Sequence, residues 1–167
     1  MIIELYDEGI FTVPTEMILC PTTPSGVTEE ADKIGFNRVH PEIATAVREA
    51  SEHNDMPAGV LMSLRAENSA RKELLVGVPM TPHSREPLSP FFLQKAMKSL
   101  RILINKSQVK RVTLPISAFC DMNAKARLSD FSDEGHGIQA LTKYMLIKEL
   151  MLLEASLYDE VEFILVH

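Results

Sequence analysis

The chain has 167 residues, of which 46% are apolar and 24% charged, so it can bury the core of a globular domain without metals or disulfides. A net charge of −6 at pH 7 disfavours nucleic acid as a partner, because phosphate binding needs a basic surface. Two cysteines, Cys20 and Cys120, are too few for a disulfide scaffold, and no signal peptide is recognised, so a cytoplasmic protein is expected. No uncharged apolar run reaches about 18 residues, so no membrane span is predicted.

The first part of the chain is predicted to contain two strands, a long loop and a helix. The strands cover residues 1–6 and 16–21, because both runs are apolar and end at turn-forming residues. The stretch 22–40 is polar and turn-prone, and we interpret it as a long loop that carries function or as an ordinary surface excursion. A helix is predicted over 41–53, since Pro41 suits its first position and apolar residues recur at three- and four-residue spacing.

A strand–loop–helix–strand unit forms the middle of the chain. Strands are predicted at 74–80 and 112–117, and a helix at 91–104. Both strands are apolar at consecutive positions, which is typical of strands covered by helices on both faces. Strands joined by a crossover helix normally form a right-handed parallel pair, and ligands bind beyond the carboxyl ends of such strands. The segments 80–86 and 117–123 lie at those ends, so a small-molecule site is expected there first.

The remaining elements complete an α/β pattern. A strand is predicted at 59–66, a second long polar loop at 118–137, an apolar helix at 138–157 and a final strand at 161–167. This order predicts a three-layer α/β/α sandwich with a mixed, largely parallel central sheet, formed by 1–167 as one domain. The helix 138–157 has more apolar surface than one core face needs, so association of copies of this chain into a homo-oligomer is an alternative use of that surface.

The two long loops contain the first candidate site. Both follow strands, and backbone amides in such loops can bind phosphate. Their polar or conformationally free residues include Thr22, Thr23, Ser25, Gly26, Asn37, Ser117, Asp121 and Asn123. Neither loop contains a compact glycine-rich motif, so two solvated loops without a ligand are the alternative.

Cys120 is a candidate nucleophile, with His136 as its base and Asp121 or Asp133 as the group that orients the base. A lone cysteine at the end of a strand is usually a small buried apolar residue, which is the alternative.

Neither a metal nor a cofactor is predicted. The five histidines show no ligand spacing such as His-x-x-x-His; they are His40, His53, His83, His136 and His167. Asp7 follows the first strand, where its carboxylate could accept a hydrogen bond from the exocyclic amine of a base. A turn-forming Asp before Glu8 and Gly9 is the alternative.

Six segments, in order along the chain, resemble a macrodomain, the α/β/α module that binds ADP-ribose. They are 6–24 (YDEGIFTVPTEMILCPTTP), 40–50 (HPEIATAVREA), 74–81 (LLVGVPMT), 88–100 (LSPFFLQKAMKSL), 111–120 (RVTLPISAFC) and 161–167 (VEFILVH). The first is similar to the family's Gly-Asp pair and the Asp-Ala-Ile-Val-Asn-Ala-Ala-Asn run that follows. The segment 111–120 is similar to the strand and phosphate loop that read Ile-Ala-Ile-Pro-Ala-Leu-Gly-Cys-Gly.

The resemblance implies a set of ligand contacts. Asp7 falls at the position that contacts adenine, Thr23 at the Asn that meets the distal ribose, and Phe119 where a ring could stack on the ligand. The implied ligand-binding residues are Asp7, Thr22, Thr23, Ser25, Gly26, Ser117, Ala118, Phe119, Cys120 and Asp121. The family's loop glycines are largely replaced here, and each added Cβ hinders close approach of the backbone to a diphosphate.

Two functions follow from these observations. The first is binding of ADP-ribose or a related ADP-ribosyl nucleotide, with hydrolysis of an ADP-ribosyl linkage by a bound water as the only catalysis that the resemblance implies; catalytic residues are not identified. The second is an interaction or assembly module that has lost nucleotide binding.

Overall fold

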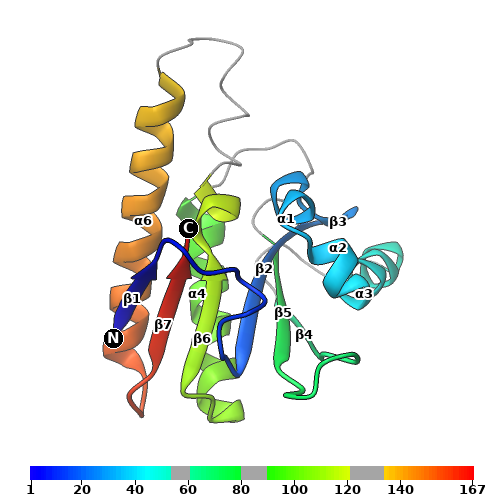
Figure 1. Cartoon of the computed structure of the whole chain (residues 1–167). Helices are drawn as coiled ribbons and strands as arrows, with labels where there is room; N and C mark the ends of the chain where they lie inside the picture. Colours follow the sequence, from blue (N-terminus) through cyan, green and yellow to red (C-terminus); the bar gives the residue numbers. More distant parts are fainter. Residues whose placement is uncertain (54–60, 80–89, 121–133) are drawn as a thin grey trace.

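A seven-stranded mixed sheet runs through the centre of the molecule (Figure 1). The computed structural model describes residues 1–53, 61–79, 90–120 and 134–167. The strands are β1 (Ile2–Leu5), β2 (Met17–Thr23), β3 (Gly26–Val27), β4 (Met62–Arg65), β5 (Leu74–Pro79), β6 (Arg111–Pro115) and β7 (Glu162–Val166). Their order across the sheet is β1-β7-β6-β2-β5-β4, and β3 pairs with β2 beside this path.

Five of the strands run in the same direction. β1 pairs with β7, β7 with β6, β6 with β2, and β2 with β5, all in parallel. β4 is antiparallel to β5, and β3 is antiparallel to β2. The carboxyl ends of the five parallel strands therefore meet along one edge of the sheet, called the carboxyl edge below, and their amino ends meet along the opposite amino edge.

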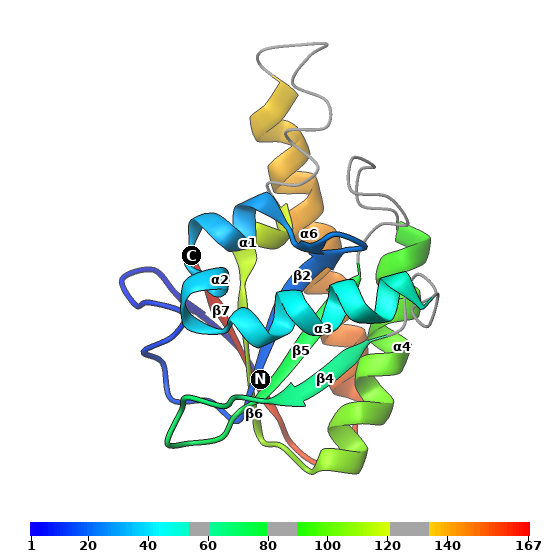
Figure 2. The same cartoon turned by 90° about the vertical axis from the view of Figure 1, so that its right-hand side faces the viewer.

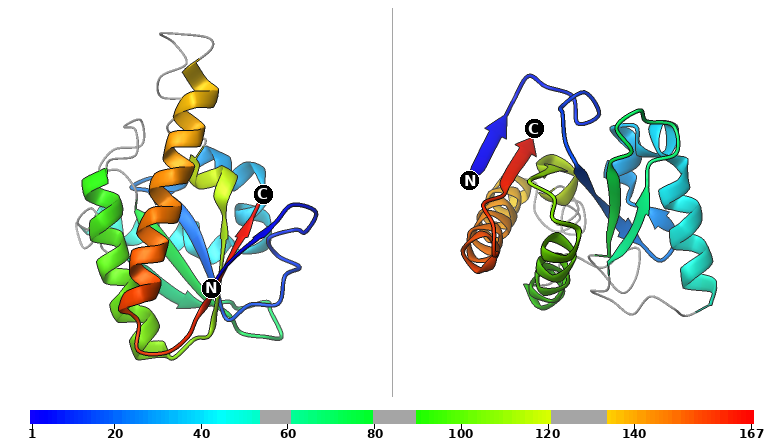
Figure 3. Two further views of the ribbon diagram at one scale, coloured as in Figure 1. Left: turned by 90° about the vertical axis from the view of Figure 1, so that its left-hand side faces the viewer. Right: turned by 90° about the horizontal axis from the view of Figure 1, so that it is seen from below.

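Helices cover both faces of the sheet. On one face lie α1 (Glu29–Lys33), α2 (Phe36–Val39) and α3 (Pro41–Glu52), which Figure 2 shows in front of the strands. On the other face α4 (Pro90–Ser107) and α6 (Glu134–Ser156) lie side by side (Figure 3). None of the helices in the described ranges is long and apolar enough to cross a membrane.

The alternating side chains of β2 explain why this strand is apolar at consecutive positions. Met17 and Leu19 pack into the core cluster that contains residues of α4 and α6. Ile18 and Cys20 pack into the second cluster, with residues of α1, α2 and α3. All seven residues of β2 are buried, as expected for a strand covered on both faces.

The predicted three-layer α/β/α sandwich with a mixed, largely parallel sheet is confirmed. The helix predicted over 41–53 is α3, and the strand predicted over 161–167 is β7. The predicted long loop over 22–40 is wrong. That stretch contains β3, α1 and α2, whose lengths of two, five and four residues are too short for apolar periodicity to detect.

Two further predictions in the middle of the chain need correction. The strands at 74–79 and 111–115 are parallel, but they are not a hydrogen-bonded pair because β2 lies between them. β6 also ends at Pro115, and residues 116–120 are helical rather than the end of a strand followed by a loop. The segments 80–89 and 121–133, which hold most of the residues expected at the strand ends, lie outside the described residues.

Candidate functional site

Three segments bring polar groups to the carboxyl edge of the sheet. They are the end of β2 with its turn into β3, the helical residues 116–120 after β6, and the ends of the neighbouring strands β1 and β7 (Figure 1). Because the strands are parallel, segments that are far apart in the sequence lie along one edge.

The turn between β2 and β3 is a tight hairpin. Thr23 and Gly26 pair across it, and the Ser25 backbone N–H donates to Thr23 Oγ1 at 3.3 Å. Gly26 has a φ of 135°, a conformation that residues other than glycine rarely adopt. Thr22 and Thr23 are buried, so Pro24 and Ser25 are the exposed residues of the turn.

Arg48, on α3, places a cation beside this hairpin turn. A Cβ built on Gly26 would lie 3.9 Å from Arg48 Nη1 and 3.6 Å from Ala44 Cβ. The Arg48 side chain is exposed and forms no ion pair with any described residue. A guanidinium group is well suited to bind phosphate oxygens. Arg48 was not predicted from the sequence, and its spacing of four residues from Ala44 is the one signal that places both on the same helix face.

The amino end of α1 is acidic. Thr28 caps this helix, since its Oγ1 accepts a hydrogen bond from the Ala31 backbone N–H at 3.2 Å. Glu29 and Glu30 occupy the first turn, where carboxylates stabilise the helix dipole but repel a diphosphate. The amides of α1 are therefore poorly placed for phosphate.

The helical residues 116–120 are mostly buried. Ser117 is half-buried, and the three residues after it belong to the core. Phe119 is 1% exposed and packs in the cluster that contains α4 and α6 side chains, so its ring offers no free face for stacking on a ligand. Asp121 lies outside the described residues.

The nucleophile hypothesis rests on Cys120, whose side chain is 5% exposed and packs in the same apolar cluster. Asp121 and Asp133 lie outside the described residues, as does the side chain of His136. The hypothesis of a thiol nucleophile therefore stays a prediction.

A ring pair joins the ends of β1 and β7. The rings of Tyr6 and His167 stack with centroids 4.0 Å apart, and Glu4 Oε1 lies 3.0 Å from His167 Nε2 and 2.9 Å from Lys143 Nζ on α6. The hydrogen bond from Lys143, followed by that from His167, lowers the pKa of the Glu4 carboxyl, and the bond to Glu4 raises the pKa of Lys143. Asp7, exposed and next to Tyr6, lies beside this cluster.

Asp7 and Thr23, which the resemblance assigns to opposite ends of the ligand, are some distance apart. Asp7 follows β1, and Thr23 ends β2, with β7 and β6 between these strands. Three strand spacings separate them, which is roughly 14 Å. Only an elongated ligand could contact both.

In the described part of the chain, no group of three His, Cys, Asp or Glu side chains could hold a metal ion. His40 is buried, with Nδ1 3.4 Å from Glu42 Oε1 and Nε2 4.0 Å from Glu73 Oε1. Its ring also meets the ring of Phe11 edge to face. These contacts connect the start of α3 to the start of β5, so we assign this histidine to the structural core.

Sequence comparisons found no relative: no protein-family profile and no curated protein matches the chain. Comparison with solved structures does find similar folds. The macrodomain of Mycobacterium tuberculosis DarG superimposes with a TM-score of 0.75 at 18% identity, covering 99% of this chain and 97% of its own. The macrodomain of Thermus aquaticus DarG gives 0.70 at 16% identity, with the same coverage.

A further similar structure is that of a mutant Oceanobacillus iheyensis macrodomain with ADPR, with a TM-score of 0.63 at 12% identity, covering 96% of this chain and 82% of that one. The chain therefore has the macrodomain fold, which confirms at the level of fold the resemblance seen in the sequence.

Proposed function

We propose that the carboxyl edge of the sheet binds ADP-ribose or a related ADP-ribosyl nucleotide. The observation that carries this proposal is the hairpin turn at 23–26, where Gly26 adopts a φ of 135° beside the Arg48 guanidinium at the carboxyl edge of a macrodomain fold. A further similar structure is that of Thermosipho africanus DarTG in complex with ADP-ribose; the match covers 96% of this chain and 40% of that one.

The contacts divide between the two ends of the edge. The Arg48 guanidinium, beside the hairpin turn, would bind the diphosphate, because it presents several N–H donors to anionic oxygens. Asp7 would accept a hydrogen bond from the adenine amine. The helical residues 116–120 follow β6, which lies between β1 and β2 in the sheet, and they would border the middle of the ligand.

The test is calorimetric titration of the protein with ADP-ribose, with AMP and NAD as comparators. We expect micromolar binding of ADP-ribose, which Asp7→Ala and Arg48→Gln each weaken about tenfold. Glu8→Ala, which removes an exposed carboxylate next to Asp7, and Arg101→Gln, which removes an exposed cation on α4, are the matched controls. No heat at high ADP-ribose concentration would refute the proposal.

Hydrolysis of an ADP-ribosyl linkage would be a further step at this site, with a bound water as nucleophile. It is tested by incubating the protein with an ADP-ribosylated protein and measuring free ADP-ribose by chromatography. Release that disappears in the variant Arg48→Gln would support hydrolysis, and unchanged substrate with tight ADP-ribose binding would define a binding module.

A second function, assembly without nucleotide binding, is favoured by the outer face of α6. Tyr144, Met151 and Leu152 are 67%, 60% and 57% exposed, and their spacing places them on one side of the helix. Light scattering would then show a dimer that Leu152→Lys dissociates, together with no response to ADP-ribose. A monomer would exclude self-assembly through this face.

A further inference from the structure

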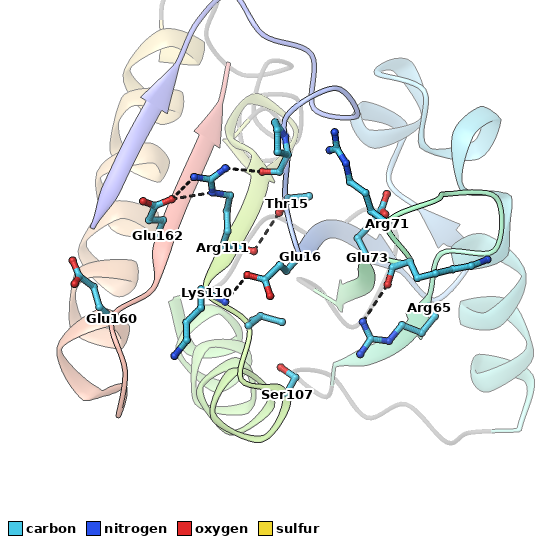
Figure 4. A pocket seen from close by; sticks show the side chains of 13 residues that line it. Thr15, Glu16, Arg65, Arg71, Glu73, Ser107, Lys110, Arg111, Glu160 and Glu162 are labelled. Carbon is cyan, nitrogen blue, oxygen red and sulfur yellow. Dashed lines mark hydrogen bonds and ion pairs between the residues drawn. The ribbon is translucent and has the colours of Figure 1, made fainter.

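A cavity with a volume of about 900 Å³ opens at the amino edge of the sheet (Figure 4). The starts of β2, β5, β6 and β7 and the end of β4 form its walls. Its volume is in the range of small-molecule sites. β2 separates this cavity from the carboxyl edge by its whole length of seven residues, which is roughly 20 Å. The cavity is therefore distinct from the proposed nucleotide site.

On the side of β6 and β7, each cation of the wall is paired with a carboxylate. Arg111 donates to Glu162 Oε2 through Nε at 2.9 Å and through Nη2 at 2.8 Å. Lys110 Nζ lies 2.9 Å from Asp159 Oδ2. Because each of these charged groups already has a partner of opposite charge, they offer no unpaired charge to a ligand.

On the side of β4 and β5, neutral backbone carbonyls hold the cations of the wall. Arg65 Nη1 donates to the Lys72 carbonyl at 3.1 Å, and Arg71 Nη1 donates to the Val13 carbonyl at 3.4 Å. Lys72 Nζ donates to the Glu67 carbonyl at 2.8 Å. None of these three cations forms an ion pair with the residues that the structure describes. The carbonyls thus position the cations without cancelling their charges.

Three carboxylates complete the lining. Glu16 Oε1 accepts the Lys110 backbone N–H at 3.0 Å, and within the described ranges Glu16 has no ion-pair partner. Glu73 is largely buried, and its Oε2 accepts the Ser69 hydroxyl at 2.5 Å, so this side chain is held in the wall. Glu160 is exposed and lies on the β7 side (Figure 4). The lining is therefore cationic toward β4 and β5 and anionic toward Glu16 and β7.

We infer that this cavity binds a small zwitterion of the amino acid type. Its carboxylate pairs with the Arg65 guanidinium group, and its ammonium group pairs with Glu16, toward which Arg65 points in Figure 4. A simple anion would meet the uncompensated Glu16 carboxylate, and a simple cation would meet the uncompensated arginines. A molecule that carries both charges satisfies both walls.

The experiment is calorimetric titration of the full chain with each of the proteinogenic L-amino acids. The amino acid that binds best is then compared with its carboxamide and its N-acetyl derivative, each of which lacks one charge. We expect the free amino acid to bind and each derivative to bind at least about tenfold more weakly. The absence of binding by every amino acid overturns the inference. So does equal binding of the carboxamide, which would indicate a cation site, or of the N-acetyl derivative, which would indicate an anion site.

Variants locate the site. Arg65→Gln and Glu16→Gln should each weaken binding about tenfold, while Arg101→Gln, an exposed arginine outside the cavity, should leave it unchanged. Glu16→Gln keeps an oxygen to accept the Lys110 N–H, and Arg65 is exposed and makes one side-chain bond to the described residues, so both variants should fold. Unchanged binding in both variants would place the ligand elsewhere and overturn the inference. If the protein binds an amino acid but does not bind ADP-ribose, the proposed nucleotide site is refuted and the inference about this cavity stands.

Discussion

Tyr6 and His167 stack across the ends of β1 and β7, with ring centroids 4.0 Å apart and ring planes 13° from parallel. β1 is the edge strand, and it pairs with β7 over only four residues. Glu4, in the same strand, binds both His167 and Lys143 of α6. These side-chain contacts therefore anchor the edge strand that leads to Asp7.

The Glu4 carboxyl makes this anchor dependent on pH. Lys143, and after it His167, lowers the pKa of Glu4 below its ordinary value of 4.5, so the stability it contributes is present above pH 4.5 and is lost as the pH falls through the lowered value. Glu4→Gln should lower the free energy of unfolding by about 0.5–1 kcal/mol near neutral pH. This difference should shrink as the pH falls below 4.5, as measured by urea unfolding near neutral pH and at about pH 3.

Glu49→Gln is the control for this measurement. Glu49 is exposed on α3, and its carboxylate makes no ion pair within the described ranges, so its removal should change stability little at either pH. A Glu4→Gln deficit that persists unchanged at about pH 3 would show that packing, rather than the charge of Glu4, anchors β1.

Gly26→Ala should destabilise the protein by about 1–3 kcal/mol. The reason is conformational: its φ of 135° is costly for alanine, although a Cβ there would make only ordinary contacts with Ala44. Thermal unfolding measures the effect. Ser25→Ala is the control, since Ser25 is an exposed residue of the same turn and its φ is not positive; equal losses in both variants would contradict a conformational cause.

The layers of this fold were predictable because a strand that is buried on both faces is apolar at consecutive positions. β2 and β5 are apolar at consecutive positions, and α3 shows helical spacing after Pro41. The helices α1 and α2 were not predictable, because five and four residues are too few for a periodic pattern. Nor could the sequence show that β2 lies between β5 and β6, since strand order depends on contacts between distant segments.

Part of the candidate site was likewise predictable from the sequence, and part was not. The stretch 22–40 was predicted to be turn-prone, and the hairpin turn between β2 and β3 occurs near its start. Arg48 could not be assigned, because its place beside Gly26 depends on how α3 packs on the sheet. Phe119 was expected to contact ligand as part of a loop. The helical backbone of 116–120 turns its ring into the core instead.

The Cys20 thiol should be unreactive in the folded protein. It is fully buried in β2, and burial raises its pKa well above the ordinary value of 9.0, so almost no thiolate forms. In the variant Cys120→Ser, labelling by an aromatic disulfide reagent should proceed only as fast as the protein unfolds, and urea should accelerate it. Rapid labelling without denaturant would show that the strand opens locally.

Thr113→Val should stabilise the protein by about 1 kcal/mol. Thr113 is fully buried in β6, its hydroxyl oxygen has no hydrogen-bond partner among the described residues, and its neighbours in the adjacent strands are Ile18 and Ile164. Valine has nearly the same shape and removes the cost of burying that hydroxyl group.

Thr15→Val is the opposite case, and it makes the comparison decisive. Thr15 is also buried, but its Oγ1 donates to the Met17 carbonyl at 2.8 Å. Valine at this position leaves that carbonyl without this donor, so the free energy of unfolding should fall by about 1 kcal/mol. Urea unfolding of the two variants should therefore shift in opposite directions. A loss of stability in Thr113→Val equal to that in Thr15→Val would mean that the Thr113 hydroxyl has a partner, such as a buried water.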